Sequence, residues 1–345
     1  MSAPAISADA TATETDRVAL DVAGLTVDLR TPSGTVRAVD GVSFTARRGE
    51  TLALLGESGC GKSMTAQAIV GLLEPIADVT EGEIRLVATD SGAVDLVAAS
   101  TKTRRALAAT ELAIVFQDAL TALNPVYTVG KQLAEPFRIH RRNSANEARQ
   151  EAISLMRRVG IPEPESRVDS YPHQFSGGMR QRLLIAMAVA LSPSVLLADE
   201  PTTALDVTVQ AQIMTLLRDL RSERDMAVVL ITHDLALVAE EADRVAIMYA
   251  GNVVETGPVA EVFADPRHPY TKGLLDSVPV HAERGTDLKS IGGIPPDLHS
   301  IPSGCVYQAR CPLARDLCRE VRPTLEIVAD ERKSACHFVS EVSGV

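Results

Sequence analysis

The chain has 345 residues, and its 34 Lys and Arg against 45 Asp and Glu give a formal net charge of −11. This acidic balance argues against a nucleic-acid groove as the main surface, because phosphate backbones bind basic patches. With 46% hydrophobic residues the chain can fill a sizeable α/β core plus one appendage, yet no apolar run reaches the ~20 residues that span a bilayer. Any membrane attachment is therefore expected to go through other subunits.

The N-terminal segment is predicted to be a disordered tail over residues 1–16. It is rich in Ala, Ser and Thr, and it lacks the basic start and apolar stretch of a secretory signal. Residues 17–48 then alternate apolar and polar positions around the turn TPSG at 31–34. Alternation of this kind predicts antiparallel strands.

A glycine-rich loop follows, in the sequence GESGCGKS at 56–63. It comes after the apolar stretch TLALL at 51–55 and before the helix-competent MTAQAIVGLL at 64–73, which is the context of a phosphate-binding loop. Backbone N–H groups of such a loop surround phosphate oxygens, Lys62 reaches the β and γ phosphates, and Ser63 binds Mg²⁺. The alternative is a glycine-rich turn with a capping lysine. The loop predicts binding of ATP or GTP, and the residues expected to contact the nucleotide are Gly56, Glu57, Ser58, Gly59, Cys60, Gly61, Lys62, Ser63 and Met64.

Cys60 lies inside this loop, two residues before Lys62. A thiol beside an ammonium and at a helix N-terminus can have a lowered pKa and a raised reactivity. The alternative is an inert small residue that fits the loop.

Residues 81–99 resemble a second hairpin, and from about 118 to 190 the pattern becomes helical, with prolines at 162, 164 and 172. Within it, FSGGMRQR at 175–182 precedes an apolar helix. Ser176, Gly177 and Gly178 form a helix N-terminus rich in free N–H donors, and therefore a second anion site. An ordinary helix cap with two loop glycines is the alternative.

The segment SVLLADEP at 194–201 reads as a buried strand that ends in two acids. Acids at the carboxyl end of such a strand lie next to the phosphate loop of an open α/β sheet. Asp199 is expected to hold Mg²⁺, and Glu200 to act as the general base that polarises the attacking water. A pair of solvated acids at a strand end is the alternative.

Taken together, these motifs resemble those of the ATP-binding cassette (ABC) ATPases. Gln117 in IVFQDALTALNP is similar to the family's Q-loop glutamine, Ala204-Leu205-Asp206 to its D-loop, and His233 in VVLITHD to its switch histidine. The resemblance implies an α/β fold: a P-loop NTPase cassette over residues 17–265, with a RecA-like core, an antiparallel β subdomain and a helical subdomain at about 118–190.

The resemblance also implies a mechanism shared between two cassettes that face each other head to tail. Glu200, His233 and Gln117 would be catalytic, and Ser63, Gln117 and Asp199 would hold Mg²⁺. The signature loop at 176–178 would serve the ATP bound to the partner, and one copy of each motif means that the partner is a second chain. Leu29 occupies the position where many members stack an aromatic ring on adenine, with Arg30 or Arg37 as possible supplements.

Residues 266–345, here called the C-terminal extension, begin with HPYTKGLL at 268–275. Together with FQDALTALNP and YPHQFSGGMRQR, this tail resembles the ATP-binding subunits of oligopeptide and dipeptide importers. The resemblance implies ATP hydrolysis that drives import at the cytoplasmic face of the membrane, with two integral-membrane permease subunits and an extracytoplasmic peptide-binding protein. Import of nickel or another small solute is the alternative. A soluble ABC ATPase and a small-molecule kinase are more remote ones.

Four cysteines fall within the extension: Cys305, Cys311, Cys318 and Cys336. Four thiolates suit either a structural zinc or an iron-sulfur cluster, and disulfides are disfavoured in a chain that faces the cytosol. The spacing lacks the Cys-x-x-Cys knuckles of zinc ribbons, and the resemblance to peptide-importer tails implies a [4Fe-4S] cluster. Zinc and unligated core cysteines are the alternatives.

Overall fold

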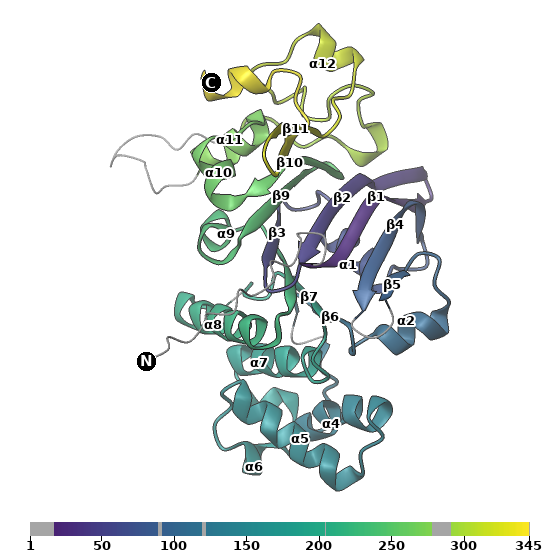
Figure 1. The fold of residues 1–345 in the computed structure, drawn as a ribbon, viewed down its shortest axis with the longest axis vertical. Coiled ribbons are helices and arrows are strands. Elements are labelled where there is room, and N and C mark those ends of the chain that lie inside the picture. Colours follow the sequence, from purple (N-terminus) through teal and green to yellow (C-terminus); the bar gives the residue numbers. More distant parts are fainter. Residues whose placement is uncertain (1–16, 89–91, 119–121, 204, 278–290, 345) are drawn as a thin grey trace, which may run out of the picture.

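Two β-sheets occupy the middle of the molecule in a computed structural model that describes residues 17–88, 92–118, 122–203, 205–277 and 291–344. Four helices lie at one end of the long axis and the C-terminal residues at the other (Figure 1). The predicted disordered tail, residues 1–16, lies outside the described residues.

The larger sheet carries the motifs. Among the described residues it has eight strands in the order β11-β12-β10-β9-β3-β8-β7-β6. Strands β6, β7, β8, β3 and β9 run parallel, and β10, β12 and β11 continue the sheet antiparallel. The bounds are β3 Thr51–Leu55, β6 Leu112–Val115, β7 Val195–Asp199, β8 Ala227–Thr232, β9 Arg244–Tyr249, β10 Asn252–Pro258, β11 Glu326–Ala329 and β12 Arg332–Ser334.

The central parallel strands are buried on both faces, which explains their continuous apolar sequences. Every residue of β3, β7 and β8 is buried. Both faces of this part of the sheet are therefore covered, as in other doubly covered α/β sheets. The strands predicted at 51–55 and 194–201 are confirmed.

The smaller sheet is antiparallel, with the order β2-β1-β4-β5. Its strands are β1 Val18–Thr31, β2 Gly34–Arg47, β4 Ala77–Ala88 and β5 Gly92–Asp95. The hairpin predicted around the turn at 31–34 is confirmed by the pairing of Thr31 with Gly34, and the second hairpin by the pairing of β4 with β5.

The helices within the described residues fall into two groups. Those of the larger sheet and its C-terminal side are α1 Lys62–Val70, α2 Thr101–Leu107, α8 Val207–Arg224, α9 Leu235–Glu241, α10 Val259–Ala264, α11 Pro269–Asp276 and α12 Asp316–Glu320. The other four are α4 Val129–His140, α5 Ala145–Arg158, α6 Pro164–Arg167 and α7 Gly177–Ala188. This second group has an apolar core of its own, which contains Leu133, Phe137, Met156 and Leu183.

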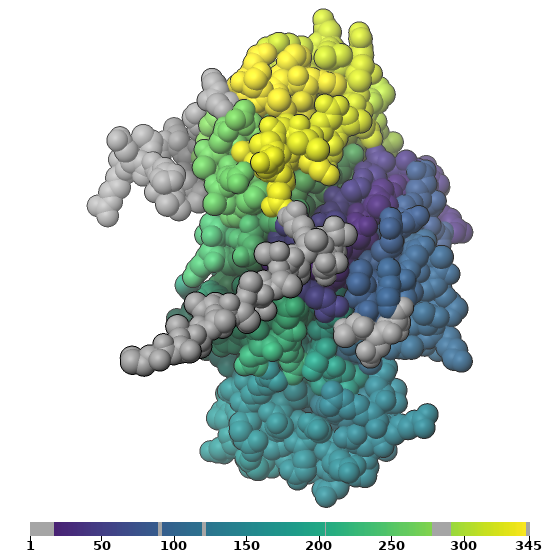
Figure 2. All heavy atoms as spheres, in the orientation of Figure 1, coloured from purple at the N-terminus to yellow at the C-terminus, as the bar shows by residue number. Residues whose placement is uncertain are grey.

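The C-terminal residues are built onto the larger sheet. Strand β12 pairs with β10 through Glu255 and Thr256, and β11 pairs with β12. Figure 2 shows the C-terminal residues in yellow, lying against the green segment that contains α10 and α11. No helix within the described residues is long and apolar enough to cross a membrane.

Candidate active site

Four parallel strands bring the predicted residues to one edge of the larger sheet. The phosphate loop follows β3, Gln117 follows β6, Asp199 ends β7, and His233 follows β8. Since the carboxyl ends of parallel strands meet at the same edge, residues from distant parts of the sequence become neighbours.

Close backbone approaches explain two glycines of the phosphate loop. A Cβ atom on Gly56 would lie 2.3 Å from the Met248 carbonyl oxygen. Gly61 has a φ of +104°, and its Cβ would lie 2.7 Å from the Ala38 carbonyl oxygen. A larger side chain at either position would push the loop away from the strands beside it.

Lys62 begins α1 and is held within the loop. Its Nζ donates to the carbonyl oxygens of Gly56 at 2.7 Å and Glu57 at 3.0 Å. The side chain is thereby directed along the inside of the loop, where an ammonium can reach phosphate oxygens.

Ser63 and Asp199 form the pair expected to hold magnesium. The Ser63 Oγ donates to Asp199 Oδ1 at 3.1 Å. Burial raises the pKa of Asp199, with the Glu200 charge acting in the same direction and the Ser63 hydrogen bond and Lys62 charge opposing it. A buried carboxylate and a hydroxyl side by side are the hard oxygen ligands that Mg²⁺ takes alongside nucleotide phosphates, so these residues fit the ion.

Glu200 is held on both carboxylate oxygens. Oε2 accepts from Gln117 Nε2 and from Thr203 Oγ1, both at 2.8 Å, and Oε1 lies 3.0 Å from His233 Nδ1. Burial alone would raise the pKa of Glu200, but the His233 and Thr203 hydrogen bonds outweigh it and leave the pKa below its usual value. The carboxylate is therefore ionised at neutral pH, as a general base must be.

The backbone of Glu200 is strained. Its φ of +45° is a left-handed conformation that non-glycine residues rarely adopt. Such conformations persist where the surrounding structure enforces them, and they concentrate at functional sites.

Two details of this group differ from the sequence reasoning. Gln117 was expected to hold Mg²⁺ together with Ser63 and Asp199. In the structure its side chain donates to Glu200 instead, while Ser63 and Asp199 are hydrogen-bonded to each other. Thr203 was not among the predicted residues. Its place three residues after Glu200, just beyond a strand-ending Pro201, is the signal that could have found it.

The signature loop lies apart from these residues. Ser176 caps α7 through a hydrogen bond from the Met179 N–H. A Cβ on Gly178 would lie 2.6 Å from Val209 Cγ1, and one on Gly177 would lie 3.7 Å from Leu205. The loop therefore packs against the D-loop and the start of α8, and the tight approach explains Gly178.

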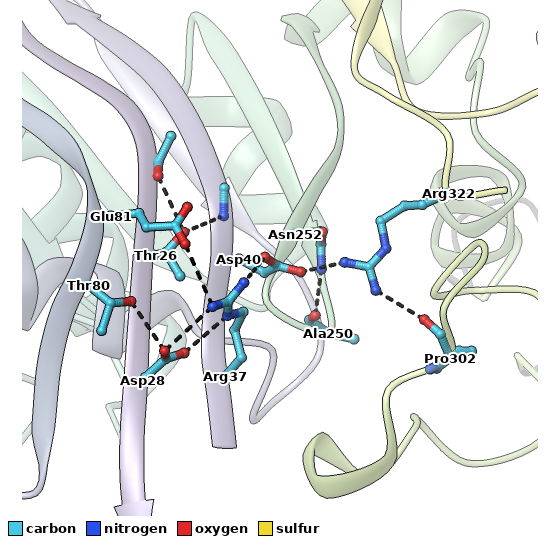
Figure 3. A network of polar contacts seen from close by, with 12 residues as sticks. Thr26, Asp28, Arg37, Asp40, Thr80, Glu81, Ala250, Asn252, Pro302 and Arg322 are labelled. Carbon is cyan, nitrogen blue, oxygen red and sulfur yellow. Dashed lines mark hydrogen bonds and ion pairs between the residues drawn. The ribbon is translucent and has the colours of Figure 1, made fainter. Parts of the chain in front are cut away.

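The strands expected to face adenine carry a polar network. Leu29 is half-buried on β1 and packs against the main core. Arg30 pairs with Asp78, and Arg37 donates to Asp28 at 3.1 Å and to Asp40 at 3.4 Å. Asp40 also pairs with Arg322 of the C-terminal extension (Figure 3). Arg30 and Arg37, the two arginines expected to supplement Leu29 at the adenine, are thus both paired with acidic residues of the same sheet.

For Cys60 the structure favours the inert residue over the reactive thiol. Its side chain is buried, and burial raises its pKa, with the Lys62 ammonium 3.8 Å away opposing the shift only in part. The lowered pKa that a reactive thiol needs is absent because desolvation outweighs the neighbouring charge.

The four cysteines of the extension share one neighbourhood but no ligand geometry. Burial raises the pKa of Cys311 to about 12 and of Cys336 to about 11, and the charges of the other cysteines act in the same direction. All four are free thiols. Within the part of the chain that the structure describes, no group of three or more His, Cys, Asp or Glu is arranged to hold a metal ion. The geometry therefore does not support a single-ion site.

The fold and this edge of the sheet define an ABC-type ATPase, an enzyme that binds and hydrolyses ATP. Residues 39–203 match the ABC transporter family, and residues 254–318 match the oligopeptide/dipeptide transporter C-terminal region. The chain belongs to the ATP-binding subunits of ABC transporters that carry this oligopeptide/dipeptide C-terminal region.

Relatives and solved structures agree with that assignment. The dipeptide transport ATP-binding protein DppD of Bacillus subtilis (strain 168) is 50% identical over 318 residues, covering 92% of this chain and 93% of the relative. DppD of Escherichia coli (strain K12) is 47% identical over 325 residues, covering 94% and 98%. The dimeric ATP-binding cassette MJ0796 bound to ADP and Pi superposes with a TM-score of 0.61 at 27% identity, covering 70% of this chain and 98% of that one.

Proposed function

We propose that this chain powers the import of dipeptides or oligopeptides across the cytoplasmic membrane by hydrolysing ATP. The observation that carries the catalytic part is the Glu200 carboxylate, ionised and held by Gln117, Thr203 and His233 beside the Ser63–Asp199 pair. The cargo rests on the relatives, which are named as dipeptide transport proteins.

Each residue has a distinct role in the proposed reaction. Lys62 and the loop N–H groups bind the β and γ phosphates, and Ser63 and Asp199 hold Mg²⁺, which neutralises developing charge on them. Glu200 accepts a proton from the attacking water, while His233 and Gln117 fix its carboxylate. Leu29 makes an apolar contact with the adenine.

The partner is proposed to be a second ABC ATPase chain in a heterodimer. The signature loop Ser176–Gly178 packs against Leu205 and Val209, and its N–H groups would bind the partner's ATP. We also propose that the chain divides at about residue 265. The cassette before this point hydrolyses ATP, and the extension after it adds strands to the sheet of the cassette.

An apolar groove supports docking of the two permease subunits and a peripheral position on the cytoplasmic face. A cavity of about 630 Å³ lies between α1, α2, α4 and α7, and Leu72 and Phe116 line it while 56% and 37% exposed. Exposed apolar side chains in a concave site mark an interaction surface. Phe116 lies next to Gln117 in the sequence, and Gln117 donates to Glu200. A permease segment that binds in this groove would therefore contact the backbone that positions Gln117.

For the four cysteines we propose a [4Fe-4S] cluster, with zinc as the alternative. Sulfurs bound to one zinc ion at about 2.3 Å must crowd together. A four-iron cube carries its thiolate ligands on separate corners, and Cys305 and Cys318 lie in one core cluster, against which Cys311 packs. Anaerobically purified protein should contain iron and absorb visible light, and Cys318→Ser should lose both. Colourless protein with stoichiometric zinc would contradict the cluster.

The transport role is tested by isolating the chain from membranes of its own organism. We expect two integral-membrane proteins and a second ATPase to co-purify, with ATP hydrolysis stimulated by peptide-loaded binding protein. Lys62→Ala should abolish hydrolysis at this site, and Lys333→Ala, at the exposed position of β12, should not. Stimulation by nickel in place of peptide would contradict the cargo.

The docking groove has a separate test. Leu72→Asp should prevent co-purification of the permeases while ATP binding to the chain persists. Ile294→Asp, at an apolar side chain that is 84% exposed in the extension, serves as the matched control. Equal loss in both variants would show that the groove is not the docking site.

A further inference from the structure

The polar groups of Glu57, the second residue of the phosphate loop, are all bonded. Its N–H donates to the Tyr270 hydroxyl at 3.0 Å, and its carbonyl oxygen accepts from Lys62 at 3.0 Å. Its carboxylate accepts two hydrogen bonds from Arg310, at 2.7 and 3.0 Å. Tyr270 and Arg310 both belong to the C-terminal extension, so the start of the loop is held from outside the cassette.

Arg310 is itself fixed in place. Its Nε donates to the Gly292 carbonyl oxygen at 2.9 Å, and Nη2 donates to the Ile291 carbonyl oxygen at 3.3 Å. The guanidinium lies 5.7 Å from the centre of the Tyr249 ring, and the Arg310 side chain is only 4% exposed. A planar, immobilised guanidinium that binds a carboxylate through two hydrogen bonds sets an orientation as well as a charge.

An aromatic cluster carries this anchor to the sheet. Tyr249 ends β9, and its ring centre lies 4.6 Å from that of Tyr270 and 5.1 Å from that of Tyr307. Tyr307 and Arg310 share the short segment between Cys305 and Cys311, which places the anchor between two of the four cysteines. Movement of this segment would therefore move the group that holds Glu57.

We propose that Arg310 is a positioning residue for ATP binding: through Glu57 it fixes the phosphate loop in the shape that surrounds the phosphates. A loop prepared in its bound shape loses less conformational freedom when the ligand binds, so ATP binds more tightly. This role affects the affinity for ATP. It does not depend on which cargo is transported or on which group the cysteines hold. The chemical step is left to Glu200, which neither Arg310 nor Glu57 contacts among the described hydrogen bonds.

A double-mutant cycle in the assembled transporter tests the proposal. Arg310→Met keeps the apolar stem against Tyr249 and removes the charge, and Glu57→Ala removes the carboxylate. Each should raise the KM for ATP about tenfold with kcat changed less than about twofold. The KM of the double variant should be no higher than that of the single variant with the higher KM, because both changes break the same ion pair. The KM of Arg310→Lys should lie between those of wild type and Arg310→Met, since lysine keeps the positive charge but cannot make the two parallel hydrogen bonds of the guanidinium.

Glu331→Gln is the matched control. It breaks another ion pair between the extension and the cassette, at 2.6 Å to Arg47 on β2, and should leave the KM for ATP unchanged. If Arg310→Met does not fold, as judged by thermal unfolding, Arg310→Lys and Glu57→Ala carry the test. An unchanged KM in the folded variants, or a double variant whose increase is the product of the two single increases, would overturn the proposal.

Discussion

At the scale of single residues, Glu200 concentrates the chemistry in one strained position. Its left-handed backbone turns the carboxylate toward Gln117 and His233, and their hydrogen bonds keep it ionised despite burial. The sequence predicted this acid from its place at a strand end. The spacing of Thr203 from Glu200 gave a usable signal, but the backbone strain gave none, because it depends on how the turn after β7 folds.

Glu200→Gln should retain ATP binding and reduce hydrolysis at this site by roughly 10²–10⁴-fold, because an amide cannot accept the proton from water. Single-turnover hydrolysis and nucleotide affinity, measured in the assembled transporter, separate the two effects. The corresponding variant in the proposed partner chain is the control, since it leaves Glu200 intact. Wild-type turnover in both variants would show that Glu200 is not the base.

The buried Cys60 should resist alkylation at neutral pH. Burial raises its pKa, so little thiolate forms, and its side chain is only 5% exposed. A maleimide should therefore leave ATP hydrolysis unchanged over the time in which an exposed thiol reacts fully. Inhibition that is prevented by Mg-ATP and absent in Cys60→Ser would contradict this expectation.

At the scale of elements, pattern strength decided what the sequence could predict. The fully buried and mostly apolar β3, β7 and β8 follow from continuous apolar runs, and the two hairpins of the smaller sheet follow from strand patterns around turns. Strands β11 and β12 do not, since EIVA and RKS are too short to show a pattern and acquire their role by pairing with β10. The HPY segment was predicted as the start of a tail, and the structure adds that His268 caps α11 and that Tyr270 contacts the phosphate loop.

His268 should make stability depend on pH through α11. The side chain is fully buried, and burial lowers its pKa to about 3. From about pH 6.5 downward the unfolded chain binds a proton that the folded chain does not, so stability falls by roughly 1.4 kcal/mol per pH unit. The midpoint of thermal unfolding should therefore decrease between pH 7 and 5, and decrease less in His268→Asn, which retains a helix cap.

Glu255 is the neighbour that acts with the opposite sign. It accepts the His268 N–H, and burial raises its pKa, so the folded chain binds a proton more readily there than the unfolded chain does. Comparing His268→Asn with wild type at each pH isolates the histidine, because Glu255 is present in both. Identical pH profiles would show that His268 is not responsible.

At the scale of the whole molecule, cassette and extension share one sheet. Strand β12 covers β10, Arg332 lies 3.3 Å from the buried Glu255, and Arg310 and Arg322 reach residues of the cassette. The sequence predicted an extension but not that it shares a sheet with the cassette, because contacts between distant segments leave no periodic signal. The site was easier to predict than these contacts, since its motifs lie at the ends of strongly patterned strands.

A chain that ends at residue 265 should be poorly soluble and bind ATP weakly. It would expose the edge of β10 and the Tyr249 ring and leave Glu57 without Tyr270 and Arg310. Soluble yield, thermal unfolding and ATP affinity against the full chain measure the effect. A truncated chain equal to the full chain in all three would mean that the cassette is stable and competent alone.

The distance in sequence between Glu57 and Arg310 also sets an order of events during synthesis. The two residues are 253 positions apart. At the usual 5–20 residues per second, the phosphate loop leaves the ribosome roughly 10–50 s before the arginine that holds it. Strand β10 waits for β12 over a shorter and later interval, because Arg332 follows Glu255 by 77 residues. A nascent chain, or one that ends before Arg310, therefore carries an open sheet edge and an unanchored loop, and the phosphate loop gains its anchor only after Arg310 has been translated.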